Sequence, residues 1–155
     1  MALTLHLGVI DIPYAQAPKR HQRKAGAGGT QTTGDVAGWL ENRYHVMEIF
    51  AEEKGDKIAA ALEDSLAGAL ESAFMGAANL NNYDPTGKAM TDIEDVFKVF
   101  LSSREIEKLG YPGIPTQAAQ DGVNHRLKRP YQKRAARPSF VDTGLYMASF
   151  KAWVD

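Results

Sequence analysis

The feature that most constrains the fold is a row of large apolar residues at every fourth position between residues 58 and 74. The row consists of Ile58, Leu62, Leu66, Leu70 and Phe74. Residues four apart lie on one face of an α-helix, and the alanines at 59, 69 and 73 allow another helix to approach closely. The spacing therefore predicts a helix over 56–75 with an apolar face turned towards a second helix.

Further helical segments are predicted on both sides of this helix. One begins at Thr33 or Asp35, either of which could cap it, and runs to Gly55 with apolar positions at 36, 39, 40, 47 and 50. Another follows the capping-box pattern of Thr91 and Glu94. A short helix or a bend is expected over 102–109, and a short helix that Thr116 caps is expected over 116–127. Residues 76–90 between the longer helices read as a loop.

Strand patterns occur near both ends of the chain. Residues 3–10 alternate between apolar and polar positions and contain β-branched side chains, which predicts a strand. Near the other end, one helical turn over 145–149 followed by a strand over 150–154 is expected, with an uninterrupted strand as the alternative. A chain of 155 residues with these elements is expected to form a single domain over 1–155.

Charge is strongly segregated along the chain although the net charge is only −1. Residues 35–121 carry a net charge of −9, whereas 122–137 carry +6 and contain no acid. The basic side chains fall in two segments, an extended arm over 15–33 and a loop over 128–138 with its lead-in. They are Lys19, Arg20, Arg23 and Lys24 in the first, and Arg126, Lys128, Arg129, Lys133, Arg134 and Arg137 in the second.

The two basic segments have three interpretations. They could dock on the acidic surface of neighbouring copies, because complementary charge steers and registers such contacts. They could be plain solvated segments, since a chain region without a hydrophobic period cannot offset its ordering entropy. They could also bind the phosphates of nucleic acid. Docking between subunits is the interpretation we favour.

Several function classes find no support in the residues. The chain contains no cysteine, which excludes disulfides, Cys-ligated metals and a thiol nucleophile, and suits a reducing compartment. It shows no secretory leader and no apolar run of the roughly 20 residues that a membrane-spanning helix needs. We therefore expect a soluble protein without a membrane partner.

No catalytic, cofactor-binding or metal-binding constellation is predicted. The four histidines lack short metal-ligand spacing, and His45, near Glu41 and Glu48, reads as part of a solvated helix face or as a pH-sensitive contact. The stretch Thr86-Gly87-Lys88-Ala89 resembles the end of a phosphate-binding loop but lacks its upstream glycine and its final hydroxyl. The chain is expected not to be an enzyme.

A motif near the C-terminus carries a family resemblance. Asp142-Thr143-Gly144-Leu145, followed by Ser149 and an aromatic-rich segment, resembles the D-T-G-x-L-x-x-S signature of the head–tail joining proteins of tailed bacteriophages. These are also called neck, connector or tail-completion proteins. Tyr146 stands at the family's leucine position. In the family a long helix and a basic, proline-containing loop precede the signature, and the helices over 35–75 and Arg137-Pro138 match that order.

The resemblance implies an α+β fold in which long helices pack on a small antiparallel sheet. Phe140, Leu145, Tyr146, Phe150 and Trp153 would anchor the motif in the core. It also implies a homo-oligomeric ring, commonly a hexamer, in the neck of the virion, assembled in the host cytoplasm. Portal and tail proteins would be its partners, and the basic residues would contact neighbouring subunits or packaged DNA. The alternative function is a small nucleic-acid-binding protein that uses the same two basic segments.

Overall fold

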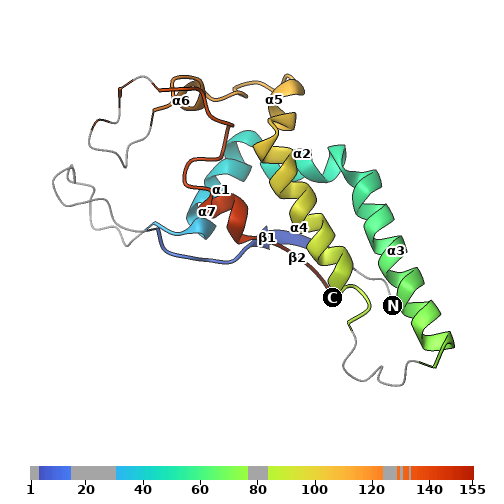
Figure 1. Cartoon of the computed structure of the whole chain (residues 1–155). Coiled ribbons are helices and arrows are strands. Elements are labelled where there is room, and N and C mark those ends of the chain that lie inside the picture. Colours follow the sequence, from blue (N-terminus) through green and yellow to red (C-terminus); the bar gives the residue numbers. More distant parts are fainter. Residues whose placement is uncertain (1–3, 15–30, 77–83, 124–128, 130, 133) are drawn as a thin grey trace.

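The computed structural model describes residues 4–14, 31–76, 84–123, 129, 131–132 and 134–155 (Figure 1). These residues form two strands and seven helices, in agreement with the predicted α+β class. The elements are β1 Leu5–Val9, α1 Thr33–Tyr44, α2 Val46–Glu53, α3 Gly55–Phe74, α4 Gly87–Ser102, α5 Glu105–Lys108, α6 Gln117–Gln120, α7 Leu145–Ser149 and β2 Phe150–Val154.

The sheet joins the two ends of the chain. β1 and β2 pair antiparallel, with Leu5 opposite Val154 and Val9 opposite Phe150. The predicted strands and the single helical turn before β2 are thus confirmed, and the alternative of an uninterrupted strand is wrong. On the outer face the ring of Trp153 stacks on His6 at 5.3 Å and lies over Gly8, where an added β-carbon would come within 3.0 Å of it.

Four phenylalanines form the centre of the core. Phe50 on α2, Phe97 and Phe100 on α4, and Phe150 on β2 are each at most 1% exposed. The rings of Phe97 and Phe150 stack with centroids 3.9 Å apart, and Phe50 meets Phe97 edge-on at 5.0 Å. In Figure 1, α4 lies against the sheet on one side and beside α3 on the other. α4 is therefore the helix that joins the sheet to the other helices.

The predicted placement of the C-terminal aromatic side chains is correct only in part. Tyr146 and Phe150 are buried as expected, while Phe140 and Leu145 are half-buried. Trp153 is 46% exposed, so the expectation that it anchors the core is wrong. The reason is the pleat of β2, which turns position 153 to the face opposite Phe150 and Ala152.

The helix predicted from Thr33 to Gly55 is divided in two. His45 adopts a left-handed conformation with φ of 53° between α1 and α2. The Glu41 carboxylate accepts hydrogen bonds from the backbone N–H groups of Met47 and Glu48 at 2.8 and 3.1 Å, and so caps the start of α2. At the start of α1 the cap is Thr32, in a capping box with Asp35, whereas Thr33 is buried.

The long predicted helix is confirmed as α3, but its apolar row is packed along only part of its length. Ile58 is buried, Leu62 and Leu66 are half-buried, and Leu70 and Phe74 are 60% and 87% exposed. Ser65 and Ala69, one residue off the row, are buried, and the Ser65 hydroxyl donates to the Pro85 carbonyl at 2.7 Å. The second half of the row therefore has no partner among the described residues.

Other helix ends differ from expectation in smaller ways. α4 begins at Gly87, four residues before the predicted cap, so the Thr91 hydroxyl donates to the Gly87 carbonyl inside the helix at 3.1 Å. Asp84 instead organises this start by accepting from Thr86 N–H at 2.8 Å. The predicted cap at Thr116 is confirmed, although α6 ends at Gln120. Residues 77–83 of the predicted loop lie outside the described residues.

An ion pair between α5 and the junction of α2 and α3 makes stability depend on pH. The Lys54 ammonium, which also lies over the Phe100 ring, donates a hydrogen bond to Glu105. That bond holds the pKa of Glu105 below its usual value despite partial burial. A lowered folded-state pKa means that the stabilisation is present above the carboxyl's ordinary pKa and is lost as the pH falls through the lowered one.

We therefore expect Glu105→Gln to lower the free energy of unfolding by about 1 kcal/mol at pH 7, and this difference to shrink as the pH falls below the ordinary pKa of a glutamate. Urea titrations across this pH range measure the difference. Asp95→Asn, which removes an exposed ion pair with Lys98 on α4, is the control and should change stability by less than about 0.5 kcal/mol throughout. A Glu105→Gln effect that persists unchanged in acid would contradict the assignment.

Candidate interaction site at the C-terminal motif

The residues of the D-T-G motif build a turn that leads directly into the core. Gly144 precedes α7 with a φ of 77°, a conformation that favours glycine, and Thr143 Oγ1 accepts from the Leu145 N–H at 3.3 Å. At the other end of α7 the buried Ser149 hydroxyl donates to the Tyr146 carbonyl at 2.9 Å. Asp142 is exposed at the start of the turn. The motif thus sets the angle at which β2 begins.

Arg137, which the sequence groups with the interface cations, makes several contacts within the fold of its own chain. Its guanidinium donates to the Val141 carbonyl at 3.0 Å and to the Val123 carbonyl at 3.1 Å, and lies 3.5 Å from the Asp142 carboxylate. Its backbone N–H also donates to the Ala119 carbonyl at 3.0 Å. Arg137 therefore fastens the segment after α6 to the motif turn.

A pocket of about 310 Å³ lies between the motif turn, α1 and the start of α6. Its apolar wall consists of Tyr14, Val36, Leu40, Tyr44, Phe140 and Tyr146. Thr116, Arg137, Asp142 and Thr143 supply polar groups, and Gly144 and the exposed Ala118 complete the lining. Arg137 and the motif, which the sequence treats as separate features, are thus brought together at one site.

The wall of this pocket contains polar atoms with no internal partner. Tyr146 is 3% exposed, and neither its hydroxyl nor Arg137 Nε has a hydrogen-bond partner among the described residues. Burial, with smaller contributions from the Glu41 charge and Tyr14, raises the pKa of the Tyr146 hydroxyl, which therefore stays neutral at ordinary pH. A neutral phenol beside apolar rings suits binding rather than acid–base chemistry.

The remaining predicted basic residues divide into two groups. Arg129 and Arg134 are exposed, and the Arg134 guanidinium donates to the Arg129 carbonyl at 2.9 Å. The backbone here packs so closely on Gly122 that a β-carbon at 122 would approach the Ala135 carbonyl to 2.8 Å. The second group, Lys19, Arg20, Arg23, Lys24, Arg126, Lys128 and Lys133, lies outside the described residues.

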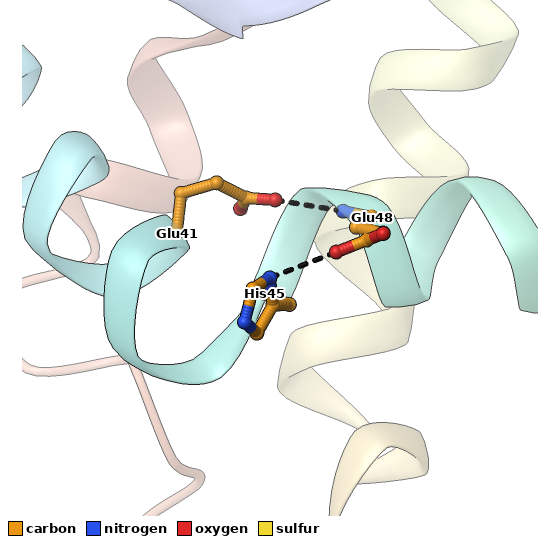
Figure 2. A group of neighbouring side chains, drawn as sticks. All are labelled: Glu41, His45 and Glu48. Carbon is orange, nitrogen blue, oxygen red and sulfur yellow. Dashed lines mark hydrogen bonds and ion pairs between the residues drawn. The ribbon is translucent and has the colours of Figure 1, made fainter.

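Glu41, His45 and Glu48 are the described residues that come closest to a metal-ligand set (Figure 2). One potential ligand atom from each lies within 4.8 Å of the others, and His45 Nδ1 is 2.8 Å from a Glu48 carboxylate oxygen. Figure 2 shows the Glu41 carboxylate directed at the backbone of Glu48. The capping of α2 accounts for Glu41, and an exposed pair three residues apart accounts for the other two side chains. We therefore interpret these three side chains as part of the junction between α1 and α2, not as a metal site.

Sequence reasoning did not find the pocket at the motif turn, because its wall comes from segments that are far apart along the chain. Aromatic residues stand at 14, 44, 140 and 146, but the sequence predicts a place only for Phe140 and Tyr146, in the core, and none for Tyr14 and Tyr44. The rings of Tyr44 and Phe140, 5.2 Å apart and tilted, contact each other within the pocket wall. No helix of the described residues is long and apolar enough to cross a membrane.

Comparison of the chain with models of known protein families, with curated proteins and with solved structures finds no match. The class of protein is therefore argued from the fold and the site alone. These define a small α+β domain with an aromatic pocket and with apolar surface left uncovered on its longest helix.

Proposed function

We propose that this protein is a structural subunit of a closed homo-oligomeric ring at the head–tail junction of a tailed bacteriophage. It would assemble in the host cytoplasm and contact the portal and tail proteins in the virion neck. The observation that carries the proposal is the uneven distribution of charge between the two ends of the molecule. A ring needs two different patches on each subunit, because each contact is head-to-tail.

Both basic segments are rooted at the pocket end. The first leaves the described structure after Tyr14, which lines the pocket, and returns at Gln31, whose carbonyl accepts from the Tyr14 N–H at 2.9 Å. The second follows Val123, whose carbonyl accepts from Arg137. Residues 15–30 carry four basic and no acidic side chains, and 122–137 carry six and none. Both basic segments are therefore joined to described residues at the pocket end of the molecule.

The opposite end is acidic. α3 carries Asp56, Glu63, Asp64 and Glu71 against the single base Lys57. In Figure 1 this helix extends away from α1, α6 and α7, and its last turn lies at the far side of the molecule. Complementary charges on opposite ends favour a head-to-tail contact over a symmetric dimer, which would bring like patches together.

The motif geometry adds a second line of support. A turn at Asp142–Gly144, one helical turn and a strand follow each other in the order that the resemblance to neck proteins implies. The sheet they enter has only two strands, which is below the size that is stable by itself in water. Packing of α4 compensates on one face, and a subunit of this size gains further from neighbours that cover its surfaces.

The proposal predicts that neutralising the first basic segment weakens assembly without changing the fold. We expect a variant with Lys19, Arg20, Arg23 and Lys24 replaced by serine to need at least tenfold more protein to assemble, as measured by sedimentation velocity. Its thermal unfolding midpoint should move by less than about 2 °C, because the proposal assigns these side chains to contacts between subunits and not to the fold of one subunit. Neutralising Lys88, Lys98, Lys108 and Lys151 instead removes the same charge outside both the basic segments and α3, and is the control.

The nucleic-acid alternative predicts a different result. Non-specific DNA binding would fall by about 0.9 logarithmic units per tenfold rise in salt for every phosphate contacted. Steep salt dependence of DNA binding in a chain that stays monomeric would favour that alternative. Equal effects of the two four-residue variants on assembly would remove the charge argument for the ring.

A further inference from the structure

The end of α3 carries a compact apolar group that nothing in the described structure covers. Leu70, Phe74 and Met75 are 60%, 87% and 83% exposed. Positions 70 and 74 are one helical turn apart and therefore share a face. Monomeric proteins often expose single apolar side chains, but an exposed cluster that includes an aromatic ring marks an interaction surface. We refer to Leu70, Phe74 and Met75 as the α3 knob.

The pocket at the motif has the properties expected of a receptor for such a group. Its apolar wall is rich in aromatic side chains, which favour edge-to-face contact with another ring. Its volume of about 310 Å³ is at the lower end of the range for ligand pockets, a size that suits one or two protein side chains. Arg137 and Thr116 at the lining add donors that could meet acceptors around the knob.

The knob and the pocket of one molecule cannot meet each other. Figure 1 places the last turn of α3 on the opposite side of the molecule from α1, α6 and α7, and α4, which contacts both α3 and α7, lies between them. Only a second copy can bring a knob to this pocket. A patch that fits a different patch on the same molecule produces a head-to-tail contact, which closes into a ring or continues as a filament.

Charge favours the same pairing. Glu71 lies on the last turn of α3 beside the knob, and Glu63 and Asp64 lie two turns before it. The pocket is bordered by the Arg137–Asp142 ion pair, so its positive charge comes from the two basic segments that leave the described structure at this end. Docking the knob in the pocket therefore brings the acidic helix to the basic end of its neighbour. The complementary charges then fix how the two subunits align.

We propose that Phe74 of one subunit, flanked by Leu70 and Met75, inserts into the pocket formed by Tyr44, Phe140 and Tyr146 of the next subunit. This inference rests on the proposed ring and names the contact that builds it. Phe74 is the anchor because an aromatic side chain seated centrally in a partner's pocket supplies a large share of interface affinity.

The absence of native cysteine allows a direct test by cross-linking. Met75→Cys and Ala118→Cys place one thiol beside the knob and one at the pocket, both at exposed positions, and keep Phe74. Under mild oxidation this double variant should give a ladder of covalent oligomers on a non-reducing gel. The matched control, Val99→Cys with Ala118→Cys, uses the 55% exposed Val99 on α4 and should give at most a tenth as much cross-linked product.

Two further experiments test whether the contact is head-to-tail and whether it depends on Phe74. Mixing the Met75→Cys and Ala118→Cys single variants should give dimers that contain one chain of each kind and nothing larger, since each chain then has a single thiol. Adding Phe74→Asp to the double variant should reduce the ladder at least tenfold while leaving the circular dichroism melting curve unchanged, because position 74 is exposed.

A ladder no stronger than that of the control, or one unaffected by Phe74→Asp, overturns the knob-and-pocket contact. If the unmodified chain nevertheless forms a ring by native mass spectrometry, the proposed function survives and only this contact is wrong. If the unmodified chain stays monomeric and the double variant does not cross-link, both proposals fall.

Discussion

Replacing Phe150 by alanine is expected to lower the free energy of unfolding by about 3–5 kcal/mol, the largest stability loss that we predict for a single residue. Phe150 is fully buried at the start of β2, with its ring stacked on Phe97 at 3.9 Å and edge-on to Phe50 at 5.8 Å. Truncation removes these contacts and leaves a cavity between α2, α4 and the sheet, which tightly packed neighbours cannot fill.

Chemical denaturation of the two proteins, followed by far-ultraviolet circular dichroism, measures this loss. Trp153→Ala is the matched control because it removes a larger aromatic ring from the same strand. Trp153 is 46% exposed and contacts mainly His6 and Gly8, so its removal should cost about 1 kcal/mol. Equal losses for the two variants would show that the stack on Phe97 is not the centre of the core.

Arg137→Ala is expected to destabilise the protein by about 3 kcal/mol, far more than loss of an ordinary surface arginine. The guanidinium serves two backbone carbonyls, those of Val123 and Val141, and bonds from a charged donor contribute about 1.5–3 kcal/mol each. Its removal also leaves the Val123 and Val141 carbonyls without this donor and loosens the wall of the pocket.

Thermal unfolding of three variants separates this structural role from a simple charge effect. Arg129→Ala removes the same charge from an exposed side chain and should change stability by less than about 0.5 kcal/mol. Arg137→Lys keeps the charge but lacks the planar fork that reaches both carbonyls, so it should fall between the two. If Arg137→Ala melts like Arg129→Ala, Arg137 belongs with the free basic residues after all.

Periodicity in the sequence predicts the elements of this fold well where one residue pattern dominates. The apolar row of α3, the alternation in β1, and the Asp142-Thr143-Gly144 turn before α7 each fix a local conformation by themselves. The break at His45 was missed because its cause is not local to that residue. Glu41 caps α2 from six residues upstream of Met47, and the apolar row continues across the break.

Burial was harder to predict than secondary structure. The row on α3 shows which face of the helix is apolar but not whether the same chain supplies a partner, so the exposure of Phe74 was missed. Arg137 was grouped with its basic neighbours by composition, whereas its contacts depend on where Val123 and Val141 come to lie. The pocket has the same origin, since its wall joins residues from Tyr14 to Tyr146.

The central claim is that each subunit carries two different and complementary ends. Native mass spectrometry of the full-length chain across a wide concentration range tests it most directly. We predict one dominant assembly at a fixed multiple of the 17.0 kDa chain mass, with three or more copies and no further growth as concentration rises. A species that remains monomeric throughout, or that stops at a dimer, would contradict the account.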